Sequence, residues 1–246
     1  MKAEFCPLWC CGFVVSPRNS YCWIHIKDIV VLHTSCFMMI SYSVSINLIE
    51  GLWLSKVKKF YPNATDFMNY GAKISLFTGI FTLICSMTCG SVVRIFGWFT
   101  GAILTPAMIL IVGSTFFLCV LFQSNLENLT LKFGLAVLPA LVFIGGLQNV
   151  LSKGIKYSIF DSTKEMAYIP LNAELKTKGK AAVEILGAKI GKASGAIVQS
   201  GIFFLFPNAR YDDIVPLLMF IFIAVLIFWL YDVKLISQAY KKLDKS

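Results

Sequence analysis

Residues 215–231 read VPLLMFIFIAVLIFWLY, and this stretch decides the fold class because it contains no charged side chain. Its length approaches the roughly 20 residues that a helix needs to cross the hydrocarbon core of a bilayer. The whole chain of 246 residues has the same character, with 57% apolar and only 14% charged residues and a mean hydropathy of +0.75. Soluble domains are about one quarter charged. The composition therefore predicts an all-α integral membrane protein.

Other apolar stretches precede this one, so the sequence predicts about six transmembrane helices. The expected spans are residues 29–54, 70–93, 98–122, 131–151, 181–205 and 215–231. They make up one six-helix transmembrane domain, 29–236, between an unassigned N-terminal leader, 1–28, and a basic cytoplasmic tail, 237–246. An even number of spans places both termini on the same side of the membrane.

The formal net charge is +9, from 22 lysine and arginine residues against 13 aspartate and glutamate residues. Basic loops on the cytoplasmic face of a membrane protein explain such an excess, so nucleic acid is not an expected partner. Arg94, the lysines between the fourth and fifth spans and the lysines of the tail fall on one face, which predicts cytoplasmic termini. One loop departs from this pattern, because Lys56, Lys58, Lys59 and Lys73 would lie outside.

Polar side chains within the predicted spans are the strongest pointers to function, because a carboxylate there costs about 2.5–3.5 kcal/mol on insertion scales. Ser43, Asn47 and Glu50 are spaced i, i+4, i+7 and so share one face of the first span. This polar stripe favours the wall of a wet cavity. The alternative is that Glu50 lies at the interface and reaches the headgroups.

A second polar stripe follows the fourth span at helical spacing. Its members are Asn149, Ser152, Lys153 and Lys156. A solvated loop face and a cavity wall explain this stripe equally well.

The fifth predicted span is the least apolar and combines lysine with glycine. Gly187, Gly191 and Gly195 lie four apart, a small-xxx-small pattern that lets two helices approach closely. Lys192 lies within this glycine ridge, and its ammonium is expected to line an aqueous path. The alternative is a lysine that reaches the headgroups from near the helix end. Lysines in a low-dielectric pocket favour an anion, and polyphosphates suit lysine well.

Motifs for catalysis and for metal binding do not occur in the sequence. It contains no phosphate loop, no H-E-x-x-H helix and no G-x-S-x-G elbow. The eight cysteines form no C-x-x-C pair, and the two histidines lack a second pair of ligands nearby. The chain is therefore predicted not to be an enzyme and to use no metal or cofactor.

Several longer motifs make the sequence similar to a known family. They are ISYSVSINLIE (40–50), RIFGW (94–98), GLQNVLSK (146–153), KYSIFDSTKEMAYIPL (156–171) and KGKAA (178–182). Over residues 37–236 the chain closely resembles the ATP/ADP antiporters, or TLC-type nucleotide transporters, of obligate intracellular bacteria and plastids. The resemblance implies half of a major-facilitator-like 12-helix transporter, in a bacterial inner membrane. It also implies exchange of ATP for ADP, with phosphate or other nucleotides as further partners.

The resemblance also implies roles for individual residues. The buried acid of the family maps to Glu50, and its lysine in a G-K-S-G-G segment maps to Lys192, although this chain reads GKASG there. We expect Lys156, Lys180 and Lys192 to contact phosphates. We expect Asn47 and Glu50 to tune the charge and to contact the base, the ribose or a paired lysine.

The match covers only the second half of the family pattern, which predicts that the first six helices come from elsewhere. A half-transporter closes a cavity only against another half, so a second transporter half is an expected partner besides the lipid bilayer. The alternative function is a non-transporting remnant, or a partner subunit, of a split nucleotide transporter.

Overall fold

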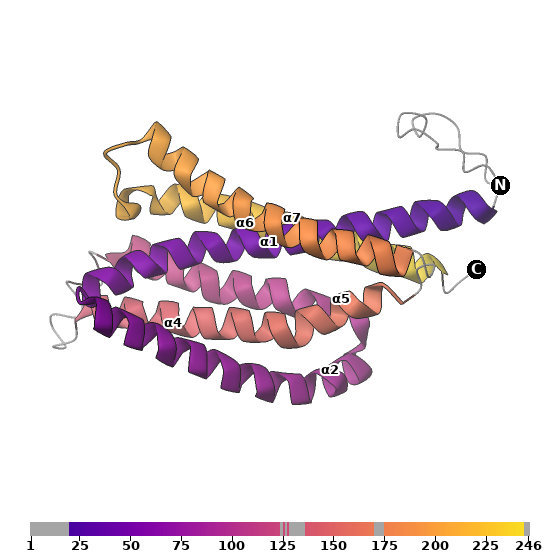
Figure 1. Ribbon diagram of the computed structural model, residues 1–246, viewed down its shortest axis with the longest axis horizontal. Coiled ribbons are helices and arrows are strands. Elements are labelled where there is room, and N and C mark those ends of the chain that lie inside the picture. Colours follow the sequence, from indigo (N-terminus) through magenta and orange to yellow (C-terminus); the bar gives the residue numbers. More distant parts are fainter. Residues whose placement is uncertain (1–19, 124, 126, 128–135, 170–174, 244–246) are drawn as a thin grey trace.

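The computed structural model describes residues 20–123, 125, 127, 136–169 and 175–243, and every element in this part of the chain is helical (Figure 1). In chain order the elements are α1 (Ser20–Phe60), α2 (Ala64–Leu121), α4 (Val137–Ile155), the π-helical turn η2 (Lys156–Phe160), α5 (Asp161–Ala167), the π-helical turn η3 (Leu175–Gly179), α6 (Lys180–Leu205) and α7 (Tyr211–Leu243). The predicted all-α membrane fold is confirmed.

The helices at the two ends of the chain are longer than the predicted spans. α1 begins at Ser20, within the predicted leader, and α7 continues to Leu243, within the predicted tail. Residues 1–19 and 244–246 lie outside the described part of the chain. The division into leader, transmembrane domain and tail stays a prediction.

α2 contains two segments that are each long and apolar enough to cross a bilayer. Its 58 residues would make a straight helix about 87 Å long at 1.5 Å per residue, far more than a bilayer needs. The chain reverses at Gly97, whose φ of 82° and ψ of 165° are rarely open to a residue with a Cβ atom. The two candidate spans within α2 are Ala64–Ser91 and Val93–Leu121, and Gly97 lies near the start of the second one. The break lies where the sequence predicts one, between 70–93 and 98–122.

Within the described residues, five helical segments are long and apolar enough to cross a membrane. They are Val31–Phe60, Ala64–Ser91, Val93–Leu121, Val137–Ala167 and Tyr211–Leu235. α6 is the remaining predicted span; it is 26 residues long, but its lysines make it less apolar than the others. These helices run along one axis in alternating directions, so α1 starts and α7 ends at the same end of the bundle (Figure 1). We call this end the Ser20 end and the opposite one the Phe60 end.

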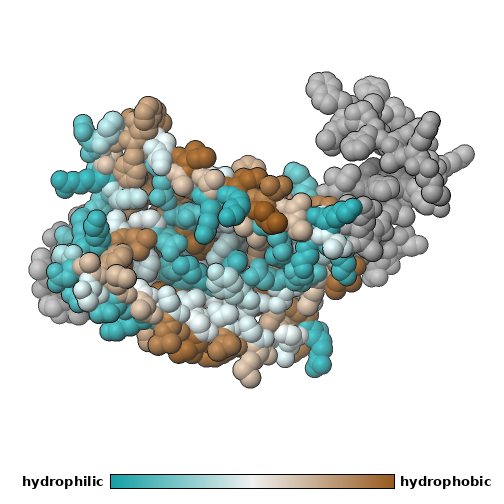
Figure 2. Space-filling view, viewed as in Figure 1, coloured by the Kyte–Doolittle hydropathy of each residue, from teal (hydrophilic) through white to brown (hydrophobic). Residues whose placement is uncertain are grey.

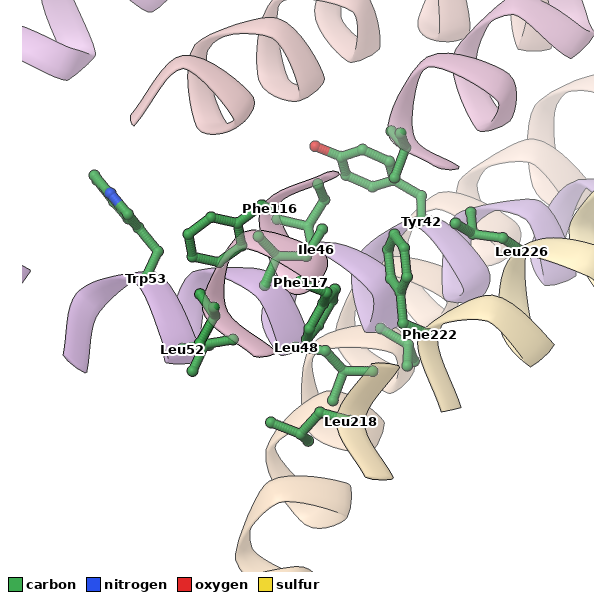
Figure 3. Packing of buried hydrophobic residues seen from close by; sticks show 14 of the residues in the cluster. Tyr42, Ile46, Leu48, Leu52, Trp53, Phe116, Phe117, Leu218, Phe222 and Leu226 are labelled. Atoms are coloured by element: carbon green, nitrogen blue, oxygen red, sulfur yellow. The ribbon is translucent and has the colours of Figure 1, made fainter. Parts of the chain in front are cut away.

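α1 is the central helix of the bundle. Its Leu52 is fully buried, in the cluster where Phe222 of α7 meets Phe117 of α2 with ring centroids 5.2 Å apart (Figure 3). The indole Nε1 of Trp53 donates a hydrogen bond to the carbonyl oxygen of Val142 in α4, at 3.1 Å. These contacts fix the rotation of α1 about its axis. They therefore also fix the direction in which its polar stripe points.

α6 packs against α1 through the glycine ridge. A Cβ atom on Gly191 would lie 2.5 Å from the Cβ of Ser43, and one on Gly195 would lie 2.6 Å from the Cβ of Asn47. Real Cβ atoms do not approach so closely, so the two helices are in backbone-level contact that only glycine permits. The close approach predicted from the spacing of the glycines is confirmed.

Lys56 is a buried cation at the Phe60 end, with only 1% of its side chain exposed. Its Nζ lies 2.6 Å from Oδ1 of Asp212 in α7 and 2.7 Å from Oε1 of Gln123, just after α2. Lys59 contacts the other oxygen of the same carboxylate at 3.0 Å. Lys56 thus ties α1 to α2 and α7, which gives a structural reason for one of the lysines that depart from the positive-inside pattern.

We expect Gly191→Ala to push α6 away from α1, because the new methyl group would overlap the side chain of Ser43. Overpacking of this kind costs about 1–3 kcal/mol. Gly201→Ala in the same helix is the matched control, since nothing lies within 4 Å of its Cβ position. The measurement is the thermal unfolding of the protein in detergent. Equal midpoints for the two variants would contradict the glycine contact.

We expect Lys56→Gln to lower the free energy of unfolding by about 1–3 kcal/mol, because hydrogen bonds to charged groups are lost at a buried position. Lys58→Gln makes the same change in net charge at an exposed position nearby and should stay within about 0.5 kcal/mol of the unchanged protein. Denaturation in detergent, followed by circular dichroism, measures both variants. A comparable loss in both would show that net charge, and not the buried cluster, matters.

Candidate functional site

A cavity of about 440 Å³ lies between α1, α4, η2 and α6. Its volume is in the range typical of small-molecule sites. Polar or charged groups reach it from each of these elements, and α6 contributes Lys192 beside Ala188. The full lining is Met39, Tyr42, Ser43, Ile46, Asn47, Glu50, Lys153, Lys156, Tyr157, Ala188 and Lys192.

The cavity lies near the middle of the membrane-spanning part of α1. The residues that α1 contributes, from Met39 to Glu50, are well inside the span Val31–Phe60. Figure 2 shows a band of hydrophilic side chains along this face of the molecule, with hydrophobic side chains above and below it. Charged groups at this depth normally face a partner or a water-filled cavity. The geometry therefore favours the cavity-wall reading of Glu50 over the interfacial one.

The charge of the cavity is mainly positive, from three lysines and one glutamate. Oε1 of Glu50 lies 3.0 Å from Nζ of Lys153, with the two side chains 32% and 30% exposed. Lys192 has no ion-pair partner among the described residues. No group of three or more His, Cys, Asp or Glu side chains that could hold a metal ion is found within the same residues. Ammonium groups with one carboxylate suit an anion.

α4 continues into the π-helical turn η2 where it reaches the cavity. Such turns frequently occur at functional sites, because the wider turn shifts the direction of the side chains. Nζ of Lys156 lies 4.2 Å from the ring centroid of Tyr157 and 5.7 Å from that of Tyr42, within the range of cation–π attraction. Its distance to Oδ2 of Asp161 is 3.6 Å. Two rings and one distant carboxylate hold Lys156 at the wall and leave its ammonium able to bind a further anion.

The polar stripe of α1 is also the place where a hydrogen bond joins α6 to α1. Nε2 of Gln199 donates to the carbonyl oxygen of Asn47 at 2.6 Å. The side-chain Nδ2 of Asn47 in turn donates to the carbonyl oxygen of Ser43 at 2.8 Å. Together with the glycine ridge, the bond from Gln199 holds Lys192 beside the stripe, and the bond from Asn47 to Ser43 stays within α1.

Four of the five predicted substrate-binding residues line this one cavity: Asn47, Glu50, Lys156 and Lys192. Lys153 is a lining residue that the predicted site lacks. Its signal in the sequence was its place on the second polar stripe, which the structure shows to be a cavity wall at this position. What these residues bind stays a prediction.

Lys180 does not lie in the cavity. It is the first residue of α6, about 18 Å before Lys192 at 1.5 Å per residue. Its Nζ lies 2.6 Å from Oε2 of Glu165, and this hydrogen bond raises the pKa of Lys180. The structure thus gives Lys180 a partner in α5, and its predicted contact with phosphate finds no support in the cavity geometry.

We expect the cavity to be filled with water. In a protein whose eight native cysteines are replaced, Ala188→Cys should react rapidly with a charged, water-soluble thiol reagent, because Ala188 lines the cavity. Ile197→Cys, in the same helix at a position 68% exposed and outside the cavity, should react at least about tenfold more slowly, because acyl chains exclude the reagent. The measurement is the labelling rate in proteoliposomes. Equal rates would contradict a wet cavity bordered by lipid-facing helix.

Comparisons with a family model and with individual proteins indicate the same family. The sequence model described as TLC ATP/ADP transporter matches residues 24–240. The ADP,ATP carrier protein 3 of Rickettsia bellii (strain RML369-C) is 42% identical over 208 residues, which cover 85% of this chain and 41% of the carrier. The ADP,ATP carrier protein 1 of Rickettsia conorii (strain ATCC VR-613 / Malish 7) is 42% identical over 207 residues, or 84% of this chain and 42% of the carrier.

A further relative is the ADP,ATP carrier protein 5 of Rickettsia typhi (strain ATCC VR-144 / Wilmington), 41% identical over 206 residues, which cover 82% of this chain and 41% of the carrier. The chain thus spans less than half the length of these relatives. No solved structure matches it. Since the family match extends over nearly all of the described helices, the chain belongs to the TLC ATP/ADP transporter family.

Proposed function

We propose that the chain takes part in the exchange of ATP for ADP across a membrane, as a helical unit that carries part of the nucleotide site. The observation that supports this most is the cavity near mid-membrane depth, with three lysines and one glutamate in its wall. The relatives are named ADP,ATP carrier proteins, which favours the same two nucleotides here. Relatives that are carriers also fit the expectation that the chain is not an enzyme.

The phosphates are the part of a nucleotide that this cavity would hold most strongly. An ammonium group binds phosphate oxygens as a point charge, and the attraction is stronger where lipid and protein lower the local dielectric constant. Lys156 lines the cavity from η2 and Lys192 lines it from α6, so they would bind a polyphosphate from two sides. Inorganic phosphate and other nucleotides share this chemistry and are further candidates for transport.

Asn47 and Glu50 would bind the less charged part of the nucleotide. Both lie on the α1 stripe and carry side-chain oxygens, which accept hydrogen bonds from the hydroxyl groups of a ribose or the amino group of a base. A carboxylate among lysines also reduces the excess positive charge when no nucleotide is bound. This agrees with the expected role of Glu50 in tuning the charge of the site.

A second helical unit would have to cover the cavity. Tyr157 is 54% exposed and Lys192 is exposed, so the cavity opens on the surface of this bundle at a depth where acyl chains cannot satisfy charge. We infer that another six-helix half, in the same longer polypeptide or in a separate chain, closes the path. Transporters are commonly built from two such repeats around a shared site. Relatives of which this chain spans 41% have the length for both.

The Ser20 end is proposed to face the cytoplasm, in the inner membrane of a bacterium. Arg94 lies near the reversal of α2 at this end, and Lys176 and Lys178 of η3, just before α6, lie there as well (Figure 1). Positive loops are retained on the cytoplasmic side. Lys56 is one of the lysines that would lie on the outer side in this orientation, and its buried ion pair with Asp212 neutralises its charge there.

Reconstituted protein is expected to take up labelled ATP only when the vesicles contain ADP. Lys192→Gln should weaken nucleotide binding about ten- to a hundredfold, because a charge-assisted bond worth about 1.5–3 kcal/mol is lost. Lys189→Gln is the matched control, as it removes the same charge from α6 at an exposed position outside the cavity. Uptake and the nucleotide-induced shift in Tm are both measured. Transport left unchanged by both Glu50→Ala and Lys192→Ala would remove these two residues from the site.

The two measurements together separate the alternatives. Binding of ADP without uptake by this chain alone would favour a partner subunit that needs its other half. Absence of both binding and uptake would favour a non-transporting remnant. Screening ATP, ADP, GTP, UTP and NAD in the same thermal-shift assay would identify the preferred nucleotide.

A further inference from the structure

A second cavity borders the first one on the side of the Phe60 end. It has a volume of about 170 Å³ and is lined by parts of α1, the first span of α2, and α4. Trp53 and Val57 contribute from α1, one to two turns beyond the large cavity, and Asn149 contributes from α4. Tyr70 and Ser75 line it from α2. We call it the small cavity.

The two cavities have two lining residues in common, Glu50 and Lys153. These are the two partners of the 3.0 Å ion pair between α1 and α4. The ion pair therefore stands on the boundary between the large cavity, toward the Ser20 end, and the small cavity, toward the Phe60 end. Separating the two side chains would join the cavities along the axis on which a substrate has to move.

The ion pair has the properties of a contact that can be exchanged. Each side chain is about one third exposed, at 32% and 30%, and neither has another ion-pair partner among the described residues. A bound polyphosphate would act on both partners in the same sense, since it attracts the ammonium of Lys153 and repels the carboxylate of Glu50. A ligand shifts such an equilibrium by its different affinity for the two states.

We propose that the Glu50–Lys153 ion pair is a gate that a bound nucleoside polyphosphate opens. The inference rests on the proposed function. It adds one residue, Lys153, and a coupling between nucleotide binding in the large cavity and access to the small cavity. In the empty protein Glu50 neutralises Lys153 and closes the boundary. In the occupied protein a phosphate oxygen takes the place of the carboxylate at Lys153, and the way toward the Phe60 end opens. Such coupling would make passage depend on a bound nucleotide, as exchange requires.

The test reads access to the small cavity through Asn149→Cys, in a protein whose native cysteines are replaced. Asn149 is 3% exposed and lines this cavity, so its labelling by a small water-soluble thiol reagent should be slow in the nucleotide-free protein. Adding Lys153→Gln should raise the rate about tenfold without nucleotide. Adding Lys189→Gln instead, which removes the same charge from an exposed position outside both cavities, should leave the nucleotide-free rate unchanged. Fast labelling before any gate substitution would overturn the gate.

A charge-swapped protein tests whether faster labelling comes from loss of the ion pair or from local disruption of the structure. The double substitution Glu50→Lys with Lys153→Glu keeps an ion pair at the boundary and should return labelling to the slow rate. If the swapped protein is folded, as shown by its circular dichroism and unfolding midpoint, and still labels quickly, the ion pair is not what closes the boundary.

The coupling is tested by adding ADP, with adenosine as the uncharged comparison. ADP should raise the labelling rate of Asn149→Cys about tenfold, and adenosine should not. ADP that shifts Tm but leaves labelling slow would overturn the coupling while the proposed function stands. If ADP gives no Tm shift at all, the proposed function fails and the nucleotide coupling with it. The Lys153→Gln comparison would still decide whether the ion pair closes the boundary.

Discussion

The free-energy cost of placing charge in the middle of a bilayer is the constraint on which this structure depends. An ionised side chain there needs an opposite charge, a hydrogen-bonding group or water. The bundle meets this need by turning polar faces of α1, α4, η2 and α6 toward one cavity, so that the four charged side chains of its wall lie near one another. The apolar faces are then free to contact lipid and to form the core around α1. One requirement thus sets both the packing and the site.

Close packing against α1 allows α6 to lie in the bundle with its polar face toward the cavity. α6 is not among the five segments apolar enough to count as candidate spans, and a helix of that composition gains little from contact with lipid alone. Glycine at 187, 191 and 195 lets its backbone lie directly against α1, where Gln199 donates to the carbonyl oxygen of Asn47. Dispersion contacts and an interhelical hydrogen bond replace the hydrophobic driving force that lipid does not supply. The same contact carries Lys192 to the cavity, so packing and function share one surface.

Hydropathy and helical periodicity were enough to predict the helices and most of the candidate site. Both signals are local: a span needs only consecutive apolar residues, and the faces of Glu50 and Lys192 follow from spacing along one helix. Pairings between helices are not local, and for this reason Lys153 was missing from the predicted site although Glu50 was in it. Lys180 shows the same limit, because its pairing with Glu165 in α5 is not indicated by the spacing of residues within α6, and its contact with phosphate stays a prediction. Periodicity states which residues share a face, and only the packed bundle states which faces meet.

Lys56 and Lys153 show how the same residue type can have two different roles in one bundle. The ammonium of Lys56 is sealed, at 1% exposure, between Asp212 and the amide oxygen of Gln123, so removing either partner would leave a buried charge with a large desolvation penalty. The ammonium of Lys153 is 30% exposed and has one carboxylate partner, so a phosphate can replace that carboxylate without stranding the lysine. The first contact holds three helices together and is expected to persist. In the proposed gate the second would exchange one anion for another, and a site that repeatedly binds and releases a polyanion requires this property.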